Sequence, residues 1–168
     1  MPKNTHFTRL ACLLLSSLGI LTDMLTLEKT GRETEAPMDL EESTTELVFP
    51  MGLLGFESNK RFRLISPSDI APYQLLEGLD GTPLSFLVIP STYAASDYRV
   101  DLSDEDAAAL GLRSPDDAVM INIATCRKDG TVMVNLKGPI VYHRDTLIAR
   151  QVVPNNAIDL PLTHLLKS

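Results

Sequence analysis

The sequence is poor in the residue types that build metal and redox sites. It has two cysteines and three histidines among 168 residues, and no tryptophan. Cys12 and Cys126 lie far apart and match none of the paired spacings typical of zinc or redox sites. His6, His143 and His164 are equally scattered, and none has a second histidine or cysteine at ligand spacing. The sequence therefore predicts no metal site and no cofactor.

Motifs of catalysis are also missing. The sequence contains no phosphate loop, dinucleotide fingerprint, nucleophile elbow or zinc-helix motif. The pair Gly52 and Gly55 lacks a third glycine, and tight turning explains it better than phosphate binding. The acidic cluster at 101–106 could hold a divalent cation or serve as catalytic carboxylates. A solvated helix start explains it better, because calcium loops need ligands that alternate through a defined loop. We therefore expect no enzyme.

Positive charge is in short supply. The formal net charge is -7, and the sequence pI is near 4.9. Such a chain repels phosphate backbones, so direct nucleic-acid binding has little electrostatic support. A basic protein partner is favoured, although net charge also serves solubility alone. The length predicts a single domain, and without a heptad seam we expect a monomer.

The first 37 residues resemble a secretion signal without meeting its requirements. The apolar run at 10–21 is too short to span a membrane, and no small-x-small cleavage signal follows it. Two explanations remain open: a weak export signal, or an upstream stretch outside the working protein. We prefer the second, with Met24 or Met38 as the start and 38–168 as the folded domain. The first would make the chain an exported small β-domain that binds an unknown ligand.

From Glu46 onward, short apolar runs alternate with turn residues, which is typical of an all-β sandwich or barrel. The sequence predicts a mostly β fold: a small antiparallel β-barrel-like single domain with one or two short helices. A hairpin turn is expected at 127–130, where Gly130 can take a positive φ, and a second turn at 143–145. The four strands around these turns are expected to form a meander. The predicted strands are 45–49, 61–65, 72–78, 84–90, 118–126, 131–137, 139–143 and 147–153.

One helix has clear boundary signals. Ser103 can cap its first turn, acids follow where the helix dipole favours them, and Gly111 can end it. The same start chemistry recurs at 114–117 and predicts a single helical turn.

Aromatic residues make up only 5% of the chain. Phe56, Tyr93 and Tyr98 fall in expected loops and Phe49 at the point where a predicted strand gives way to one, and burial statistics place about two thirds of such residues in a core. The exposed remainder would contribute to a protein interface.

The run Phe49-Pro-Met-Gly-Leu-Leu-Gly-Phe-Glu57 resembles the opening signature of the flagellar assembly factor FliW family. Further segments resemble the family in the same order, and together they cover about residues 45–154. The ordered combination is far more specific than any part of it. These segments are 86–90, 97–98, 110–112, 116–117, 121–125, 134–141 and 150–153.

The resemblance implies a β-barrel-like fold with short helices and a cytoplasmic partner switch. Members of the family bind flagellin, and they bind and inhibit CsrA, the RNA-binding protein that represses flagellin translation. Arg99 departs from the family, which commonly has an acid after the tyrosine, and 159–164 matches only loosely. The partner-binding residues that we expect are Phe49, Pro50, Gly52, Gly55, Phe56, Tyr98, Arg99, Asn135 and Pro139.

Overall fold

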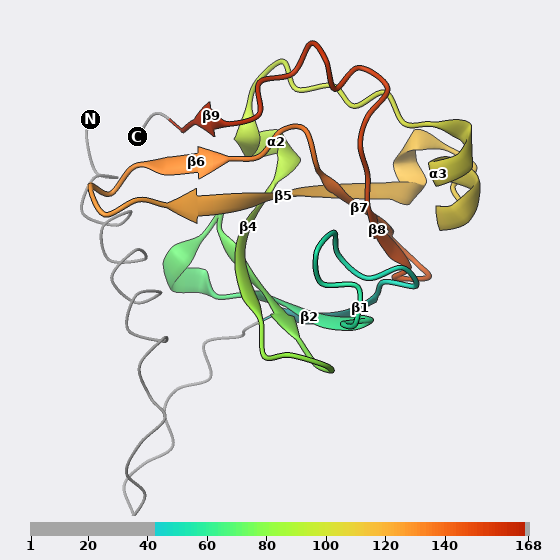
Figure 1. Ribbon diagram of the computed structural model, residues 1–168, viewed down its shortest axis with the longest axis horizontal. Helices are drawn as coiled ribbons and strands as arrows, with labels where there is room; N and C mark the ends of the chain where they lie inside the picture. Colours follow the sequence, from blue (N-terminus) through green and yellow to red (C-terminus); the bar gives the residue numbers. More distant parts are fainter. Residues whose placement is uncertain (1–42, 167–168) are drawn as a thin grey trace, which may run out of the picture.

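The computed structural model describes residues 43–166, and Figure 1 shows their arrangement. The predicted leader at 1–37 and the predicted start at 38 lie outside the described residues. Strands dominate, the sheet curls on itself, and the helical segments lie at its margins (Figure 1). In chain order the elements are β1 (Ser43–Val48), β2 (Arg61–Ser66), η1 (Ser68–Ile70), β3 (Gln74–Gly78), β4 (Ser85–Pro90), α2 (Ser91–Ala94), α3 (Asp104–Leu110), η2 (Pro115–Asp117), β5 (Ala118–Cys126), β6 (Val132–Val134), β7 (Ile140–His143), β8 (Ala149–Gln151) and β9 (His164–Leu165).

The strands form one sheet in the order β1-β2-β3-β4-β5-β6-β9, with β7 on β5 and β8 on β7. Every pair of named strands is antiparallel. The ends of the curled sheet meet at a single parallel bridge between Val48 and Ile148, where the Val48 N–H donates to the Leu147 carbonyl at 3.0 Å. The predicted mostly antiparallel, barrel-like fold is confirmed, although no ladder closes the barrel.

The predicted meander is wrong in one respect: β6 and β7 pair with different halves of β5, not with each other. β7 pairs with residues 118–121 of β5, and β6 pairs with residues 124–126 of the same strand. The connection between β6 and β7 changes direction because the Asn135 Oδ1 accepts hydrogen bonds from the N–H groups of Lys137 and Gly138, at 3.0 and 3.2 Å. This side chain redirects the backbone between the two halves of the long strand.

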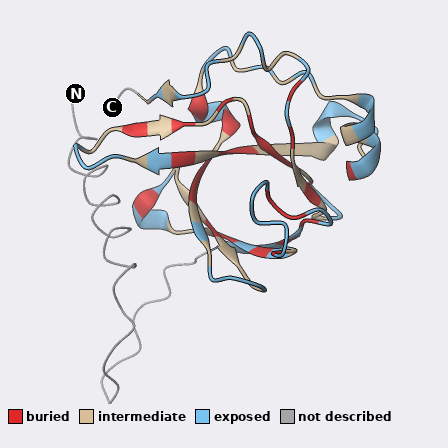
Figure 2. Ribbon diagram, viewed as in Figure 1, coloured by how far each residue is buried: buried red, intermediate tan, exposed pale blue. Residues whose placement is uncertain are grey.

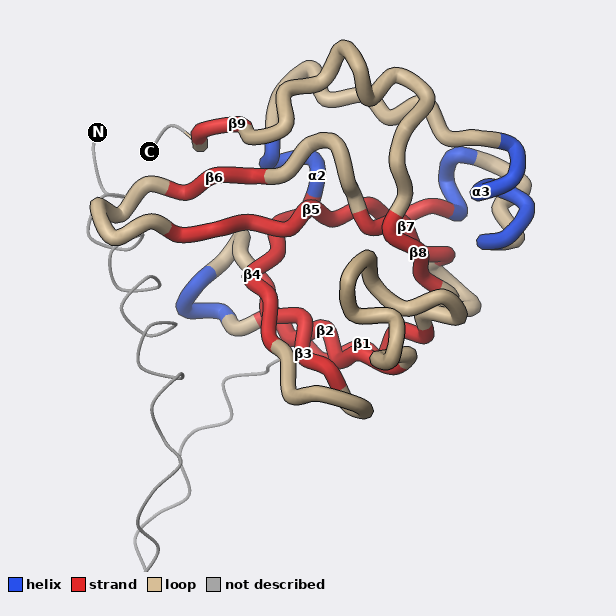
Figure 3. Tube along the Cα trace, viewed as in Figure 1, coloured by secondary structure: helices blue, strands red, loops and turns tan. Residues whose placement is uncertain are grey.

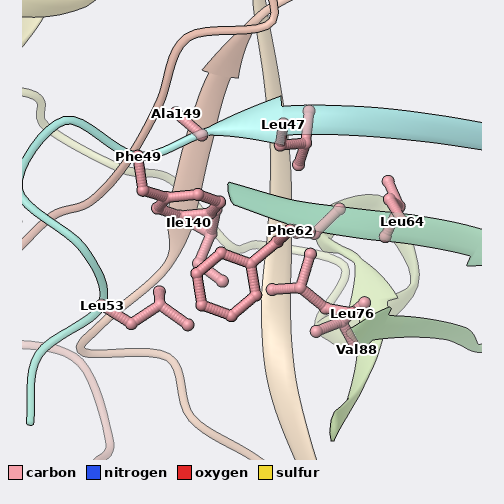
Figure 4. Close-up of a cluster of buried hydrophobic side chains, with 10 residues drawn as sticks. Leu47, Phe49, Leu53, Phe62, Leu64, Leu76, Val88, Ile140 and Ala149 are labelled. Carbon is pink, nitrogen blue, oxygen red and sulfur yellow. The ribbon is translucent and has the colours of Figure 1, made fainter. Parts of the chain in front are cut away.

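Alternation along the strands builds the main core. In β2, Phe62 and Leu64 are buried, whereas Arg61 and Arg63 are exposed. Phe62 packs edge-on against Phe49 with ring centroids 4.9 Å apart, and Figure 4 shows both rings among the aliphatic side chains of the cluster. In Figure 2 buried stretches recur along the curled strands, between intermediate and exposed ones. The sheet therefore folds around one principal apolar cluster.

Two smaller clusters flank it. One lies among β4, β5, β6 and α2, and the other consists of Leu110, Val141 and Val152 beneath α3. The strand β9 and the short segments η1 and α2 were not expected from the sequence. Their few residues provide too little periodicity for a pattern to identify them.

The predicted helix and turns are confirmed. The Ser103 Oγ accepts from the Asp106 N–H at 3.1 Å, and Gly111 ends α3 with φ +71°. The predicted single turn at 114–117 is η2, and Gly130 has φ +87° in the β5–β6 turn. Within residues 43–166, no group of three or more His, Cys, Asp or Glu side chains is placed to hold a metal ion.

Truncation of the main core should be costly. Leu76 in the central strand β3 is fully buried, so Leu76→Ala should lower the free energy of unfolding by about 2–5 kcal/mol, through lost burial and a residual cavity. Leu165→Ala in β9 is the matched control: its side chain is 48% exposed, and its effect should stay within about 0.5 kcal/mol. Equal losses in chemical denaturation would contradict this description of the core.

Candidate protein-binding site

The connection from β1 to β2, residues 49–57, is a loop anchored at two points. Phe49 and Leu53 point into the main core and are fully buried (Figure 4). The Phe49 N–H donates to the Lys60 carbonyl at 2.7 Å, which extends the β1–β2 pairing by one residue. Figure 3 shows this loop doubling back beside β1. Its backbone is therefore fixed by the same packing that fixes the sheet.

Hydrogen bonds fold the loop into consecutive turns. The Gly52 N–H donates to the Phe49 carbonyl at 2.9 Å, and the Phe56 N–H donates to the Leu53 carbonyl at 2.8 Å. The Lys60 Nζ donates to the Pro50 carbonyl at 3.0 Å. The loop is thus ordered by its own backbone, so a partner need not order it on binding.

Both glycines of the loop adopt the left-handed conformation. Gly52 has φ +74° and Gly55 has φ +84°. The Glu57 Oε1 accepts the Gly55 N–H at 2.8 Å, and this backbone hydrogen bond holds the pKa of the Glu57 carboxyl below its usual value. At Gly52 an added Cβ would lie 2.6 Å from the Glu57 Cα, whereas nothing lies within 4 Å of one at Gly55.

Beside the two buried anchors, three side chains of the loop present an apolar surface. Met51 is 67% exposed, Leu54 is 61% exposed and Phe56 is 37% exposed. The Phe56 ring also packs edge-on against Phe86, with centroids 5.4 Å apart, so its position is fixed while one face stays open. A rigid, exposed apolar surface of this kind is typical of a protein interface.

Gln151 of β8 connects this loop with a second predicted segment. Its Oε1 accepts the Leu54 N–H at 3.2 Å, and its Nε2 donates to the Gly138 carbonyl at 3.3 Å. Next to Gly138, Pro139 is buried and its carbonyl accepts the Val152 N–H at 2.9 Å. The structure therefore brings the loop at 49–57 and the segment at 135–139 together across one glutamine.

Tyr98 and Arg99 lie differently from each other. The half-buried Tyr98 hydroxyl donates to the Leu136 carbonyl at 2.7 Å and accepts from the Asn122 Nδ2 at 3.2 Å. Burial raises the pKa of the Tyr98 phenol. Arg99 is exposed, and its carbonyl accepts the Asn156 Nδ2 at 3.0 Å. Tyr98 thus supports the chain beside 135–139 from within, and only Arg99 presents its side chain to solvent.

This arrangement agrees with the comparisons to known proteins. A family model described as FliW protein matches residues 29–166. The chain belongs to the FliW family. The resemblance noted in the sequence is therefore confirmed, and the family is one of flagellar assembly factors.

Individual FliW proteins show how far the likeness extends. The chain is 34% identical to the flagellar assembly factor FliW of Geobacter sulfurreducens over 113 residues, 67% of this chain and 70% of that protein. It is 36% identical to the FliW of Geotalea uraniireducens over 117 residues, 69% and 71% of the two chains. The crystal structure of the flagellar assembly factor FliW has the same fold, with a TM-score of 0.65 at 24% identity over 72% of this chain and 84% of that one.

Sequence reasoning within this FliW chain missed Met51, Leu54 and Gln151. Met51 and Leu54 stand in an apolar run whose members look alike until the turns are known. Gln151 offered little signal, because it follows the charged Arg150 and precedes two valines, a pattern that does not mark it as a contact between two loops. In the part of the chain that the structure describes, no helix is long and apolar enough to cross a membrane.

The two loop glycines of this FliW chain should differ in their tolerance of a methyl group. Gly55→Ala forces only a left-handed alanine and should cost about 1–2 kcal/mol of unfolding free energy. Gly52→Ala adds a backbone clash with Glu57, so it should cost more and should also displace the loop. Thermal denaturation of both variants checks the order. A smaller loss for Gly52→Ala would show that the loop backbone yields easily.

Proposed function

We propose that this chain is a cytoplasmic flagellar assembly factor that alternates between two protein partners. It binds flagellin, and it binds and antagonises CsrA, which relieves the repression of flagellin translation. When flagellin accumulates, it occupies the chain and CsrA is released. Membership of the FliW family supports this role, since the family resemblance implies both partners.

The exposed apolar surface of Met51, Leu54 and Phe56 is the observation that carries the proposal. Three apolar side chains stand on a loop whose anchors are buried and whose turns are hydrogen-bonded. Binding there would cost little conformational entropy, because the loop is already ordered. We assign this surface, with the adjoining segment at 135–139, to partner binding.

Charge supports CsrA as one of the partners. The chain carries a net charge of -7, and RNA-binding proteins present basic surfaces. Opposite potentials accelerate association and help to select the partner. The acidic chain is therefore attracted to the basic surface of such a regulator.

Calorimetric titration of the full chain with purified flagellin, and separately with purified CsrA, tests the partner switch. We expect saturable binding of each, and loss of CsrA binding when flagellin is present in excess. Simultaneous binding of both partners at full affinity would contradict the switch. Absence of binding to either, at more than one temperature, would contradict the proposed function itself.

The loop surface can be tested by placing a charge on it. Leu54→Asp should weaken binding of at least one partner about tenfold or more, because a charge replaces a buried apolar contact at the interface. The hydrogen bond from the Leu54 N–H to the Gln151 Oε1 uses no side-chain atom of residue 54, so it is retained and the fold should persist. Leu162→Asp is the matched control, since Leu162 is 64% exposed and lies outside the loop. Unchanged affinity of Leu54→Asp for both partners would exclude this surface.

Arg99 offers a test of electrostatic recognition. Arg99→Glu restores the acid that the family commonly has at this position, and it should tighten CsrA binding several-fold at low salt. The gain should shrink as salt rises, because exposed charges are screened. Arg127→Glu, at the exposed β5–β6 turn, makes the same charge change elsewhere. Equal gains for both variants would show a net-charge effect and not a contact at Arg99.

A further inference from the structure

A second apolar concavity lies away from the loop, between α3, η2 and the sheet. Its volume is about 370 Å³, within the range of about 300–1,000 Å³ that is typical of ligand pockets. Met120 of β5 and Val141 of β7 line it from the sheet, and Leu102, Ala107 and Leu112 line it from the segment that carries α3. In Figure 1 this segment lies at one end of the sheet, opposite the β5–β6 turn.

The apolar cluster at this pocket is incompletely buried. It has three buried residues, Leu110, Val141 and Val152, with five partly buried hydrophobic residues packed against them. The main cluster has ten buried residues and four partly buried ones. Four of the five partly buried residues also line the pocket, so an apolar group placed there would complete their burial. These four are Leu102, Leu112, Ala118 and Met120.

The net charge of the described chain is concentrated around the same pocket. The segment 100–118 contains six acids and one base, Arg113, for a net charge of -5. The rest of residues 43–166 contains nine acids and nine bases and is therefore neutral. Nearly the entire wall of the pocket comes from this segment. An apolar concavity and a localised negative potential thus coincide.

Some of these acids have roles within the fold. Asp106 pairs with Arg150 at 3.0 Å, and the Asp117 Oδ2 accepts the N–H groups of Arg113 and Ser114, both at 2.9 Å. The backbone hydrogen bond from Arg113, followed by that from Ser114, lowers the pKa of the Asp117 carboxyl, so this group stays ionised.

Three further carboxylates are available to a partner. The exposed side chains of Asp101, Asp104 and Asp116 form no ion pair with any other residue of the described range. Arg113 lines the pocket next to Ser114 and would repel a cation there, so the partner's cations should face Asp101 and Asp104. No ion pair within the described range uses these charges, which leaves them available to a basic ligand.

We propose that this pocket receives one large apolar side chain of a basic protein segment, whose flanking lysines or arginines pair with Asp101 and Asp104. The inference goes beyond the proposed function and does not depend on it, because this pocket and the loop at 49–57 lie on different sides of β8. Arg150 of β8 contacts α3, and its neighbour Gln151 contacts the loop.

A peptide titration of the full isotope-labelled chain, followed by nuclear magnetic resonance, tests the proposal. The probe is a synthetic hexapeptide with two central leucines and two lysines on each side. It should shift the amide resonances of 100–118, Met120 and Val141, and not those of 49–57. Peptides with glutamate in place of lysine, or serine in place of leucine, should shift them far less. No shift, or equal shifts by all three peptides, would overturn the proposal.

Two alanine-to-leucine variants of α3 distinguish the effect of filling the pocket from the effect of enlarging a side chain of this helix. Ala107→Leu fills the pocket with the chain's own side chain and should weaken the lysine–leucine peptide about tenfold, equivalent to about 1.4 kcal/mol. Ala109→Leu makes the same change at an exposed position of α3 that does not line the pocket, and should bind normally. Equal binding by both variants would contradict the pocket.

A second pair of variants keeps the test decisive if Ala107→Leu fails to fold. Asp101→Asn with Asp104→Asn removes two exposed charges and should weaken the peptide several-fold while reducing its salt dependence. The control, Asp69→Asn with Asp97→Asn, removes two exposed charges elsewhere. Equal weakening by both pairs would reduce the effect to net charge and overturn the assigned contacts.

Discussion

The packing of Phe49 against Phe62 is the contact on which both the fold and the loop surface depend. Phe49 is the first residue after β1, and its ring fills the core while its N–H continues the ladder to Lys60. Its carbonyl accepts the Gly52 N–H and so begins the loop. One residue therefore transmits the rigidity of the core to Met51 and Leu54, and damage to the core would also damage the surface.

The short strand β8 has a comparable role between the two candidate interfaces. Arg150 holds α3 through Asp106, and Gln151 holds both the loop and the segment at 135–139. Successive residues of a strand point to opposite faces, so the two surfaces are separated by a strand and joined by its backbone. A displacement of β8 on binding at one surface would alter contacts at the other, which gives the two sites a physical route for coupling.

Local signals allowed much of the fold to be predicted from the sequence. Ser103, Gly111 and Gly130 mark boundaries through interactions that span only a few residues, and each prediction is confirmed. The division of β5 between two partners was beyond such reasoning, because it depends on the turn that Asn135 builds directly after β6 and on where that turn places β7. The burial of Tyr98 depends likewise on Asn122 and Leu136, which are distant in sequence.

At the candidate site, too, the sequence identifies the segment but not the orientation of its side chains. The family resemblance identified the loop, yet the adjacent Leu53 and Leu54 differ completely: one is buried in the core and the other is 61% exposed. Only the left-handed turns at Gly52 and Gly55, closed by Glu57, decide which leucine faces out. The charges at the second pocket differ in this respect. The acids of 100–118 can be read from the sequence, but only the structure shows that they lie beside an apolar concavity. Predicting this pocket therefore requires both the sequence and the structure. The amino-acid composition of 100–118 gives its charge, and the tertiary packing gives its shape.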